Sequence, residues 1–280
     1  MRVFDVDLYE YYKIKKPQGG KGILHAYILD ESVEINENRK NPAMLVIAGG
    51  GYSFVSRREA EPVCMKYLSR GFHAFWIDYS VAPIRYPYEL AEAVMAMNYI
   101  RENAEELHVD KDMTAAVGFS AGGHLCAMLG SYKDDKAVTD VFKPTVNVRP
   151  DAIILGYPVI TATGRTHAES FDNLIGDAFE HDKLSIENLV GAHSAPAFIW
   201  ATCNDNVVPV RNSLIVASAY EKAGVPFSLH IFGKGVHGLS VADGTVFGDD
   251  RWIQYGVTKN IDEWVNLSVD WLKEQKIELK

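Results

Sequence analysis

Short apolar runs alternate with longer stretches of mixed polarity along the chain. Runs of four to eight apolar residues, bounded by Gly, Pro or polar clusters, are typical of strands that are buried on both faces of a sheet. The clearest runs lie at 43–47, 72–79, 113–119, 151–157, 197–202 and 227–232. Because helix-like stretches separate these runs, the pattern predicts an α/β fold, with a mostly parallel central sheet and helices on both faces. An earlier run at 23–29 is expected to add an antiparallel strand.

The stretches between the strands predict helices at 58–70, 88–106, 211–223 and 261–273. One connection differs, because residues 159–194 are irregular in pattern and long for a link between a strand and the next element. We expect this insertion to form a small cap over a site, and the alternative is a surface insertion unrelated to substrate. A chain of 280 residues can bury one full α/β core, so a single domain is predicted over 1–280.

One junction between a predicted strand and a predicted helix carries a candidate nucleophile. Residues 117–124 read VGFSAGGH, which places a G-x-S-x-G pattern directly after the strand at 113–119. Such a turn strains the backbone and exposes the serine hydroxyl, and small neighbours admit the close approach of strand and helix. The helix N-terminus also directs N–H groups toward an anion that forms there. Ser120 is therefore the predicted nucleophile, and the alternative is a chance match in a glycine-containing loop.

A serine hydroxyl is a weak nucleophile that needs a base, and the base needs an acid to orient it. Asp205 lies in the polar turn after the apolar run at 197–202. His237 lies in the glycine-rich loop after the run at 227–232. Three strand ends thus present serine, aspartate and histidine in the chain order of the α/β-hydrolase triad.

Other residues compete for the roles of base and acid. His230 lies within a predicted strand and His124 lies one helical turn after Ser120, so both are interpreted as structural. Three further histidines fall in the insertion, where they could touch a substrate although no strand end presents them: His167, His181 and His193. The competing acids follow either an earlier strand or the histidine itself: Asp78, Asp243, Asp249 and Asp250.

Acyl transfer also needs backbone N–H donors for the tetrahedral oxyanion. The residue after the nucleophile, Ala121, supplies one such donor. Residues 48–51 read AGGG directly after the strand at 43–47, so Gly50 and Gly51 are the other predicted donors. The alternative is a phosphate-binding loop, but the G-x-G-x-x-G fingerprint and the Walker lysine are both missing.

With these residues the chain resembles α/β-hydrolase esterases, and most closely bacterial acetyl xylan esterase-like and carbohydrate acetyl esterase proteins. The likeness runs along nearly the whole chain and includes GGGY at 49–52, DYSVAP at 78–83 and VVPV at 207–210. One departure is Ala48, where many relatives carry His or Pro, so the support of the oxyanion loop differs here. The resemblance implies the α/β-hydrolase fold and a serine esterase that acts on small acyl esters, chiefly acetyl, of sugars or oligosaccharides through an acyl-enzyme.

Four aromatic residues near predicted strand ends are expected to line the acyl or alcohol pocket: Tyr52, Phe54, Tyr79 and Tyr157. Three other functions remain open. One is a general carboxylesterase. Another is a peptidase of the prolyl oligopeptidase type, which usually carries a propeller or a long N-terminal domain. The last is a non-catalytic binding module on the same fold, which usually lacks a triad member.

Composition excludes some partners. The 28 basic and 37 acidic residues give a net charge of −9, which argues against a nucleic-acid-binding surface. No apolar stretch approaches the ~20 residues of a membrane span, and the first residues lack the apolar core of a signal peptide. We therefore expect a cytoplasmic protein whose partner is a small-molecule ester, with a homo-oligomer also possible.

The three cysteines show no zinc-ligand spacing, and no metal-binding motif is found. Cys64 and Cys126 lie in apolar helical patterns and are predicted core residues, whereas Cys203 neighbours the Asp205 turn and is expected to be partly exposed. We predict neither a metal nor a cofactor, because serine hydrolases of this kind need none.

Overall fold

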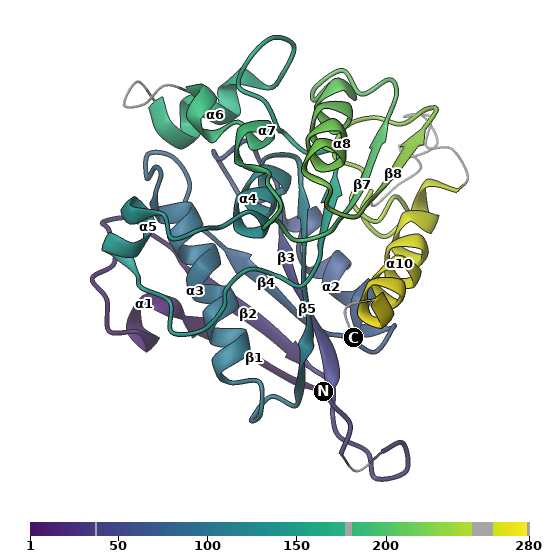
Figure 1. The fold of residues 1–280 in the computed structure, drawn as a ribbon. Helices are drawn as coiled ribbons and strands as arrows, with labels where there is room; N and C mark the ends of the chain where they lie inside the picture. Colours follow the sequence, from purple (N-terminus) through teal and green to yellow (C-terminus); the bar gives the residue numbers. More distant parts are fainter. Residues whose placement is uncertain (37, 177–180, 248–259, 279–280) are drawn as a thin grey trace.

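A computed structural model gives the fold and describes residues 1–36, 38–176, 181–247 and 260–278. Within these residues, eight strands form one sheet in the order β1-β2-β4-β3-β5-β6-β7-β8 (Figure 1). The strands are β1 (Arg2–Asp7), β2 (Ile23–Ile28), β3 (Asn41–Ile47), β4 (His73–Asp78), β5 (Val109–Phe119), β6 (Ile153–Gly156), β7 (Ala197–Thr202) and β8 (Phe227–Phe232). The β1–β2 and β2–β4 pairs are antiparallel, and the other neighbours are parallel. The predicted mostly parallel α/β sheet is confirmed.

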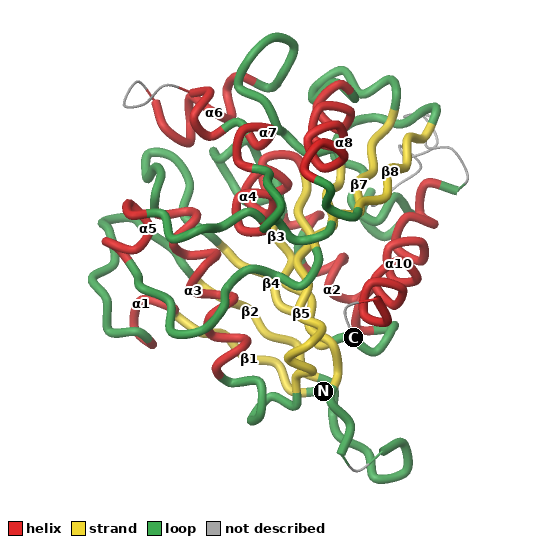
Figure 2. Tube along the Cα trace, in the orientation of Figure 1, coloured by secondary structure: helices red, strands yellow, loops and turns green. Residues whose placement is uncertain are grey.

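Helices cover both faces of the sheet (Figure 2). One face carries α2 (Glu61–Leu68) and α10 (Trp264–Glu278), which are joined by a 3.0 Å hydrogen bond between Tyr67 Oη and Ser268 Oγ. The opposite face carries α3 (Tyr88–Glu102), α4 (Ser120–Gly130), α5 (Lys136–Val141) and α8 (Arg211–Ala223). Three short elements lie outside these layers: α1 (Leu8–Tyr11), η1 (Arg57–Glu59) and η4 (Ile261–Glu263).

The helix predicted at 58–70 is split in the structure. Ala60 has φ −106° and ψ −99°, which breaks the helical path between η1 and α2. Pro62 follows within the first turn of α2. Backbone N–H groups in this turn have no helical acceptor, so the missing N–H of proline costs no hydrogen bond, and its ring fixes a helical φ. The break matters for the site, because it lets the end of η1 turn inward and buries Glu59.

The predicted irregular insertion contains helical elements. They are α6 (Ala168–Ile175), η3 (His181–Leu184) and α7 (Ile186–Leu189), which lie beyond the end of α4 in Figure 1. Phe171, Leu174 and Ile175 are buried, and their spacing places them on one face of α6. Several hydrogen bonds attach the insertion to the main fold, among them those from Asn173 Nδ2 to the Gly51 carbonyl at 2.9 Å and from His124 Nε2 to the Leu184 carbonyl at 2.8 Å.

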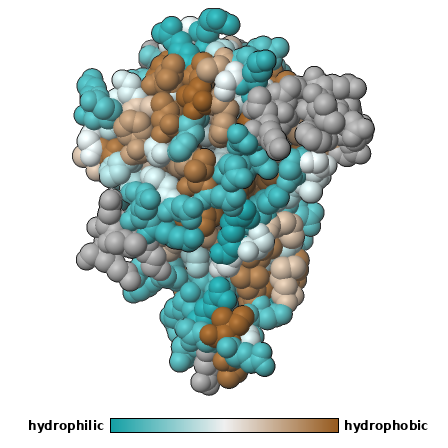
Figure 3. Space-filling model, turned by 90° about the vertical axis from the view of Figure 1, so that its right-hand side faces the viewer, coloured by the Kyte–Doolittle hydropathy of each residue, from teal (hydrophilic) through white to brown (hydrophobic). Residues whose placement is uncertain are grey.

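The surface is mixed in polarity, with apolar residues scattered among polar ones (Figure 3). The segment between β2 and β3 carries two exposed apolar residues, Val33 and Ile35. As predicted, Cys64 and Cys126 are buried and Cys203 is exposed. None of the helices in the described part of the chain is long and apolar enough to span a membrane.

Candidate active site

Ser120 lies at the junction of β5 and α4 with a φ of 52°. A positive φ is unusual for serine and marks a strained turn of the kind that presents a nucleophile. The turn packs so tightly on β3 that a Cβ on Gly122 would lie 2.3 Å from the carbonyl oxygens of Ile47 and Ala48. A Cβ on Gly118 would likewise lie 2.3 Å from the Gly122 carbonyl oxygen. Glycine is therefore required at both positions for α4 to start against the end of β3.

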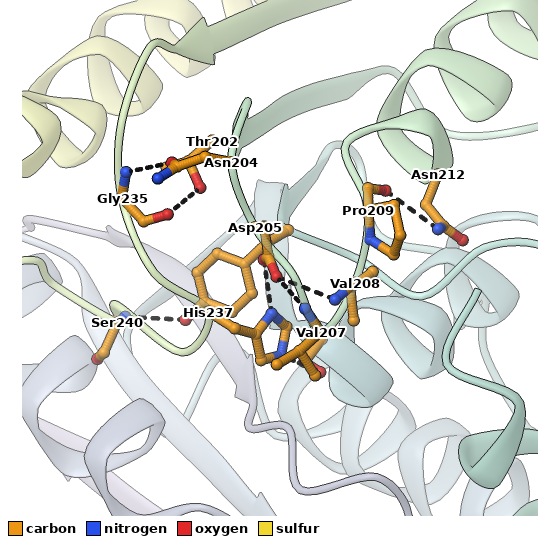
Figure 4. A network of polar contacts seen from close by, with 12 residues as sticks. Thr202, Asn204, Asp205, Val207, Val208, Pro209, Asn212, Gly235, His237 and Ser240 are labelled. Carbon is orange, nitrogen blue, oxygen red and sulfur yellow. Dashed lines mark hydrogen bonds and ion pairs between the residues drawn. The ribbon is translucent and has the colours of Figure 1, made fainter. Parts of the chain in front are cut away.

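His237 lies between Ser120 and Asp205 and is hydrogen-bonded to both. Its Nδ1 is 2.7 Å from Asp205 Oδ2 (Figure 4). Its Nε2 is 2.8 Å from Ser120 Oγ. Asp205 Oδ1 accepts hydrogen bonds from the Val207 and Val208 N–H groups at 2.9 and 3.0 Å, so the buried carboxylate is fixed. With the imidazole proton held on Nδ1 by the carboxylate, Nε2 can accept the serine proton. The structure thus brings together the three residues predicted as nucleophile, base and acid.

The loops that carry the acid and the base are joined to each other. Thr202 Oγ1 donates to the Gly235 carbonyl at 2.8 Å, and the Gly235 N–H donates to Asn204 Oδ1 at 2.7 Å (Figure 4). These bonds link the turn after β7, which carries Asp205, to the loop after β8, which carries His237. The relative position of carboxylate and imidazole therefore does not depend on their own hydrogen bond alone.

Gly50 and Gly51 lie beside Ser120 and line the same cavity. Their carbonyl groups are engaged, since Gly50 accepts from the Phe54 N–H at 3.2 Å and Gly51 accepts from Asn173 Nδ2 at 2.9 Å. Their N–H groups, in contrast, have no hydrogen-bond partner within the residues that the structure describes. Ala121 follows Ser120 in the first turn of α4, where backbone N–H groups lack helical partners. All three predicted oxyanion donors are thus available to a ligand.

The cavity in front of Ser120 has a volume of about 250 Å³. Besides Ser120, His237 and the loop glycines, it is lined by Phe54, Arg58, Glu59, His167, Glu169 and Val207. His167 and Glu169 come from the 159–194 insertion, so this segment forms part of the cavity wall. The wall combines apolar side chains with charged and hydrogen-bonding groups, an arrangement that suits a small ligand with both polar and apolar parts.

The four predicted pocket aromatics do not share one location. Phe54 lines the cavity and is exposed, whereas Tyr52, Tyr79 and Tyr157 are buried and are not among its lining residues. The three hydroxyls bond inward: Tyr52 Oη to His124 Nδ1 at 2.9 Å, Tyr79 Oη to the Ala48 carbonyl at 2.7 Å, and Tyr157 Oη to Glu59 Oε1 at 2.7 Å. A buried phenol needs such a partner, which fixes the direction of each ring. The prediction is therefore corrected for these tyrosines, which support the site's loops from behind.

Among the other histidines, His167 alone lines the cavity. His124 is buried, and its two ring nitrogens bond to Tyr52 and to the Leu184 carbonyl. Burial lowers the pKa of His124 to about 4, so this ring stays neutral at physiological pH. The rings of His181 and His193 bond to backbone carbonyls outside the cavity wall.

The competing acids lie in other surroundings. Asp243 forms an ion pair with Lys66, and Asp78 forms one with Lys21. Asp249 and Asp250 lie outside the described residues. Across the described ranges, no group of three or more His, Cys, Asp or Glu residues is placed to hold a metal ion. Asp205 is the carboxylate that contacts the His237 ring.

Sequence reasoning missed several residues of the site. Arg58, Glu59 and Glu169 line the cavity, yet the first two lie at the start of the predicted helix at 58–70 and Glu169 lies in the irregular insertion, where no pattern marks them as site residues. Nothing in the local pattern distinguishes Glu59 from its charged neighbours, although it is only 3% exposed. Its burial follows from the approach of loops that are distant in sequence.

The model of the BD-FAE family matches residues 29–220. The chain is 36% identical over 220 residues to endo-1,4-beta-xylanase B of Butyrivibrio fibrisolvens. The matched region covers 76% of this chain and 34% of that protein. It is 28% identical over 246 residues to an acetylxylan esterase of Xylanibacter ruminicola, covering 85% of this chain and 46% of that protein. The chain therefore spans less than half the length of these relatives.

A solved structure with similar architecture is that of an acetyl ester-xyloside bifunctional hydrolase from Caldicellulosiruptor lactoaceticus. The two chains are 35% identical, and they superpose with a TM-score of 0.76 over 90% of this chain and 87% of the other.

Proposed function

The chain belongs to the BD-FAE family and has the α/β-hydrolase fold, and on this basis we propose that it is a serine esterase. Its substrates are small acyl esters, chiefly acetyl, carried by sugars or oligosaccharides. The observation that carries the proposal is the hydrogen-bonded series from Asp205 through His237 to Ser120, at 2.7 and 2.8 Å, facing a cavity with available N–H donors. This arrangement contains a nucleophile, a base and an oxyanion site in one place.

The mechanism follows from these contacts. Ser120 Oγ attacks the ester carbonyl carbon while His237 Nε2 takes its proton, and Asp205 stabilises the imidazolium that forms. The N–H groups of Gly50 or Gly51 and of Ala121 receive the oxyanion. As the tetrahedral intermediate collapses, His237 returns the proton to the leaving alcohol and an acyl-enzyme remains. Water then attacks the acyl carbon by the same route, releasing the acid and restoring Ser120.

A preference for short acyl groups is part of the proposal. The cavity of about 250 Å³ in front of Ser120 shares Arg58, Val207 and His237 with a second cavity of about 570 Å³, and we assign the acyl group to the smaller cavity and the alcohol to the larger one. Each methylene that does not fit the acyl pocket disfavours the longer ester by ~1–3 kcal/mol in transition-state binding. The hydrogen-bonding side chains of Arg58, His167 and Glu169 in the wall suit the hydroxyls of a sugar. The similar proteins named as an acetylxylan esterase and an acetyl ester-xyloside hydrolase agree with this choice.

A second candidate is a general carboxylesterase for more apolar alcohols. It is favoured by Phe54 and Val207, which line the cavity and are 59% and 41% exposed. Exposed apolar side chains beside a reactive serine can contact a hydrophobic alcohol as readily as a sugar ring. The two proposed activities use the same catalytic residues. They differ in the ester that is bound, and above all in the alcohol that leaves.

An ester panel separates the two candidates. We expect the turnover of p-nitrophenyl esters to fall steeply from acetyl to octanoyl, and acetylated xylo-oligosaccharides to release acetate. Purified Ser120→Ala, carried through the same assays, measures the background. Activity that stays flat or rises up to octanoyl, with no acetate from the sugars, would replace the acetyl esterase proposal by the general carboxylesterase. Near-normal hydrolysis by Ser120→Ala would reject both.

A further inference from the structure

The Glu59 carboxylate lies buried between loops from different parts of the chain. Its Oε2 accepts a hydrogen bond from the Gly49 N–H at 2.8 Å, and its Oε1 accepts one from Tyr157 Oη at 2.7 Å. Gly49 belongs to the loop after β3, and Tyr157 directly follows β6. The side chain is 3% exposed, so both bonds are shielded from water and are strong, charge-assisted contacts.

The same network reaches the loop that carries the base. Tyr157 Oη accepts a hydrogen bond from the Ser240 N–H at 2.8 Å, and Ser240 lies three residues after His237 in the sequence. The Ser240 carbonyl in turn accepts from Trp264 Nε1 at 3.0 Å. The Tyr157 ring also packs edge-on against the His237 ring, with centroids 5.0 Å apart. A continuous series of hydrogen bonds thus joins Gly49 to the histidine loop through Glu59 and Tyr157.

The three consecutive glycines have different roles in this arrangement. Gly49 donates its N–H to Glu59, whereas the N–H groups of Gly50 and Gly51 stay available beside Ser120. A Cβ on Gly49 would lie 2.8 Å from Glu59 Oε2 and 2.9 Å from Ser120 Cβ. The carboxylate therefore lies immediately behind the loop that supplies the predicted oxyanion donors.

We propose that Glu59 is a positioning residue that holds the oxyanion loop and the histidine loop in one fixed relation. A carboxylate has two acceptor oxygens and no donor, so it can bind the Gly49 N–H and the Tyr157 hydroxyl at once. Ala48, at the start of the loop, has no polar side chain that could do this. This inference rests on the proposed function, because the loops matter only if acyl transfer occurs between them. A misplacement of ~1 Å in such a site costs about 10²-fold in rate.

The test compares three single variants. Glu59→Gln keeps the shape but removes the charge and replaces one carboxylate oxygen by an NH2 donor, so the two acceptor oxygens that face the Gly49 N–H and the Tyr157 hydroxyl are not both kept. Tyr157→Phe keeps the ring against His237 and removes only the link to Ser240 and Glu59. Glu61→Gln makes the same chemical change as the first variant at an exposed position two residues away and serves as the matched control. Each is assayed for kcat, for KM, and for the per-site rate of Ser120 labelling by a fluorophosphonate.

We expect Glu59→Gln to lower kcat by about 10²-fold with little change in KM, because loop position matters most in the transition state. The labelling rate per site should fall in parallel, and inhibition by phenylboronic acid, which forms a tetrahedral adduct on serine, should weaken by a similar factor. Tyr157→Phe should show a smaller loss, and the double variant should lose less than the product of the single effects. Glu61→Gln should match the wild type.

Two results would overturn the inference. One is Glu59→Gln with the kcat and labelling rate of the wild type. The other is a loss of activity that active-site titration explains entirely as fewer reactive sites, each with normal turnover, which is what a purely structural role produces. Labelling needs no ester substrate, so a wild type that is labelled but hydrolyses no ester rejects the proposed function alone. A wild type that is not labelled at Ser120 rejects both.

Discussion

The two ends of the central sheet each have a cavity and a histidine, but the histidines have different neighbours. At one end, His237 lies between the Ser120 hydroxyl and the Asp205 carboxylate. At the other, a cavity of about 190 Å³ is lined by residues that include Arg2, Asn41, His73 and His108. His73 Nδ1 accepts from the Leu29 N–H at 3.1 Å, and Nε2 lies 3.4 Å from the Asn41 side-chain amide.

A cavity and a histidine do not by themselves make a reactive site. Burial lowers the pKa of His73 to about 4, and neither a hydroxyl nor a carboxylate is hydrogen-bonded to its ring among the described residues. The carboxyl ends of parallel strands meet at one edge, so the loops after β3, β5, β7 and β8 converge there. At the opposite edge the strands begin, and among the described residues no histidine there has both a carboxylate and a nucleophile as partners, since His108 pairs with the Glu31 carboxylate and His73 with neither group.

The largest expected effect separates the two histidines. His237→Ala should lower kcat by about 10⁶-fold, as should Ser120→Ala, because the triad acts as a unit. His73→Asn should leave the turnover of the folded enzyme within a few-fold of the wild type, since its ring contacts no reacting group. Steady-state kinetics on p-nitrophenyl acetate, with circular dichroism to establish folding, measures both. A folded but inactive His73→Asn enzyme would mean that the two ends of the sheet are coupled.

A second prediction tests the acid that distinguishes the reactive end. Asp205→Asn should lower kcat by about 10⁴-fold, because the amide donates to Nδ1 and places the imidazole proton on the wrong nitrogen. Asp243→Asn, which loses an ion pair with Lys66 away from the His237 ring, should change kcat little. Kinetics at a pH where the wild type is fully active compares the two. If Asp243→Asn were the crippling change, the assignment of the acid would be wrong.

The smallest expected effect concerns stability at the opposite end. The folded pKa of His73, about 4, lies below its ordinary value of 6.5, so between these pH values the unfolded chain binds a proton that the folded chain excludes. Stability is therefore full above about pH 7 and falls as the pH falls through this window. We expect His73 to account for about 1–2 kcal/mol of the unfolding free energy lost between pH 7.5 and 5.

Urea unfolding of the wild type and of His73→Asn at both pH values measures this contribution. The variant should lose less stability on acidification than the wild type does. His124, with a pKa also lowered to about 4 by burial, remains in both proteins and gives the same background dependence. An identical loss of unfolding free energy in the wild type and the variant would show that folding does not exclude a proton from His73.

The strands and the candidate triad were predictable because their signals are local. Ser120, Asp205 and His237 each follow an apolar run directly or after a short loop, so their placement at one edge needed only the parallel order of the strands. Strand β1 was not predicted, because its alternation of exposed and half-buried residues is weak. The helices of the insertion were missed because α6 has only eight residues, although Phe171, Leu174 and Ile175 have helical spacing.

Predictions that required a side-chain direction were less successful. Tyr52, Tyr79 and Tyr157 follow strands as expected, but a strand end does not determine whether a ring points into a cavity or behind a loop. Their hydroxyls found partners in the interior, and that determined their orientation. Phe54 has no polar group to satisfy and remains at the exposed cavity wall.

Local sequence patterns specify which residue types follow which strands, because hydrophobic period, glycine content and turn chemistry act over a few neighbouring positions. They thereby determined the α/β architecture and the order of serine, aspartate and histidine. The tertiary structure alone decided which distant groups meet. Glu59 contacts Gly49 and Tyr157 because the break before α2 turns it inward and the packing of helices on the sheet brings the loops after β3, β6 and β8 together. Such contacts depend on distances between elements that no local pattern encodes.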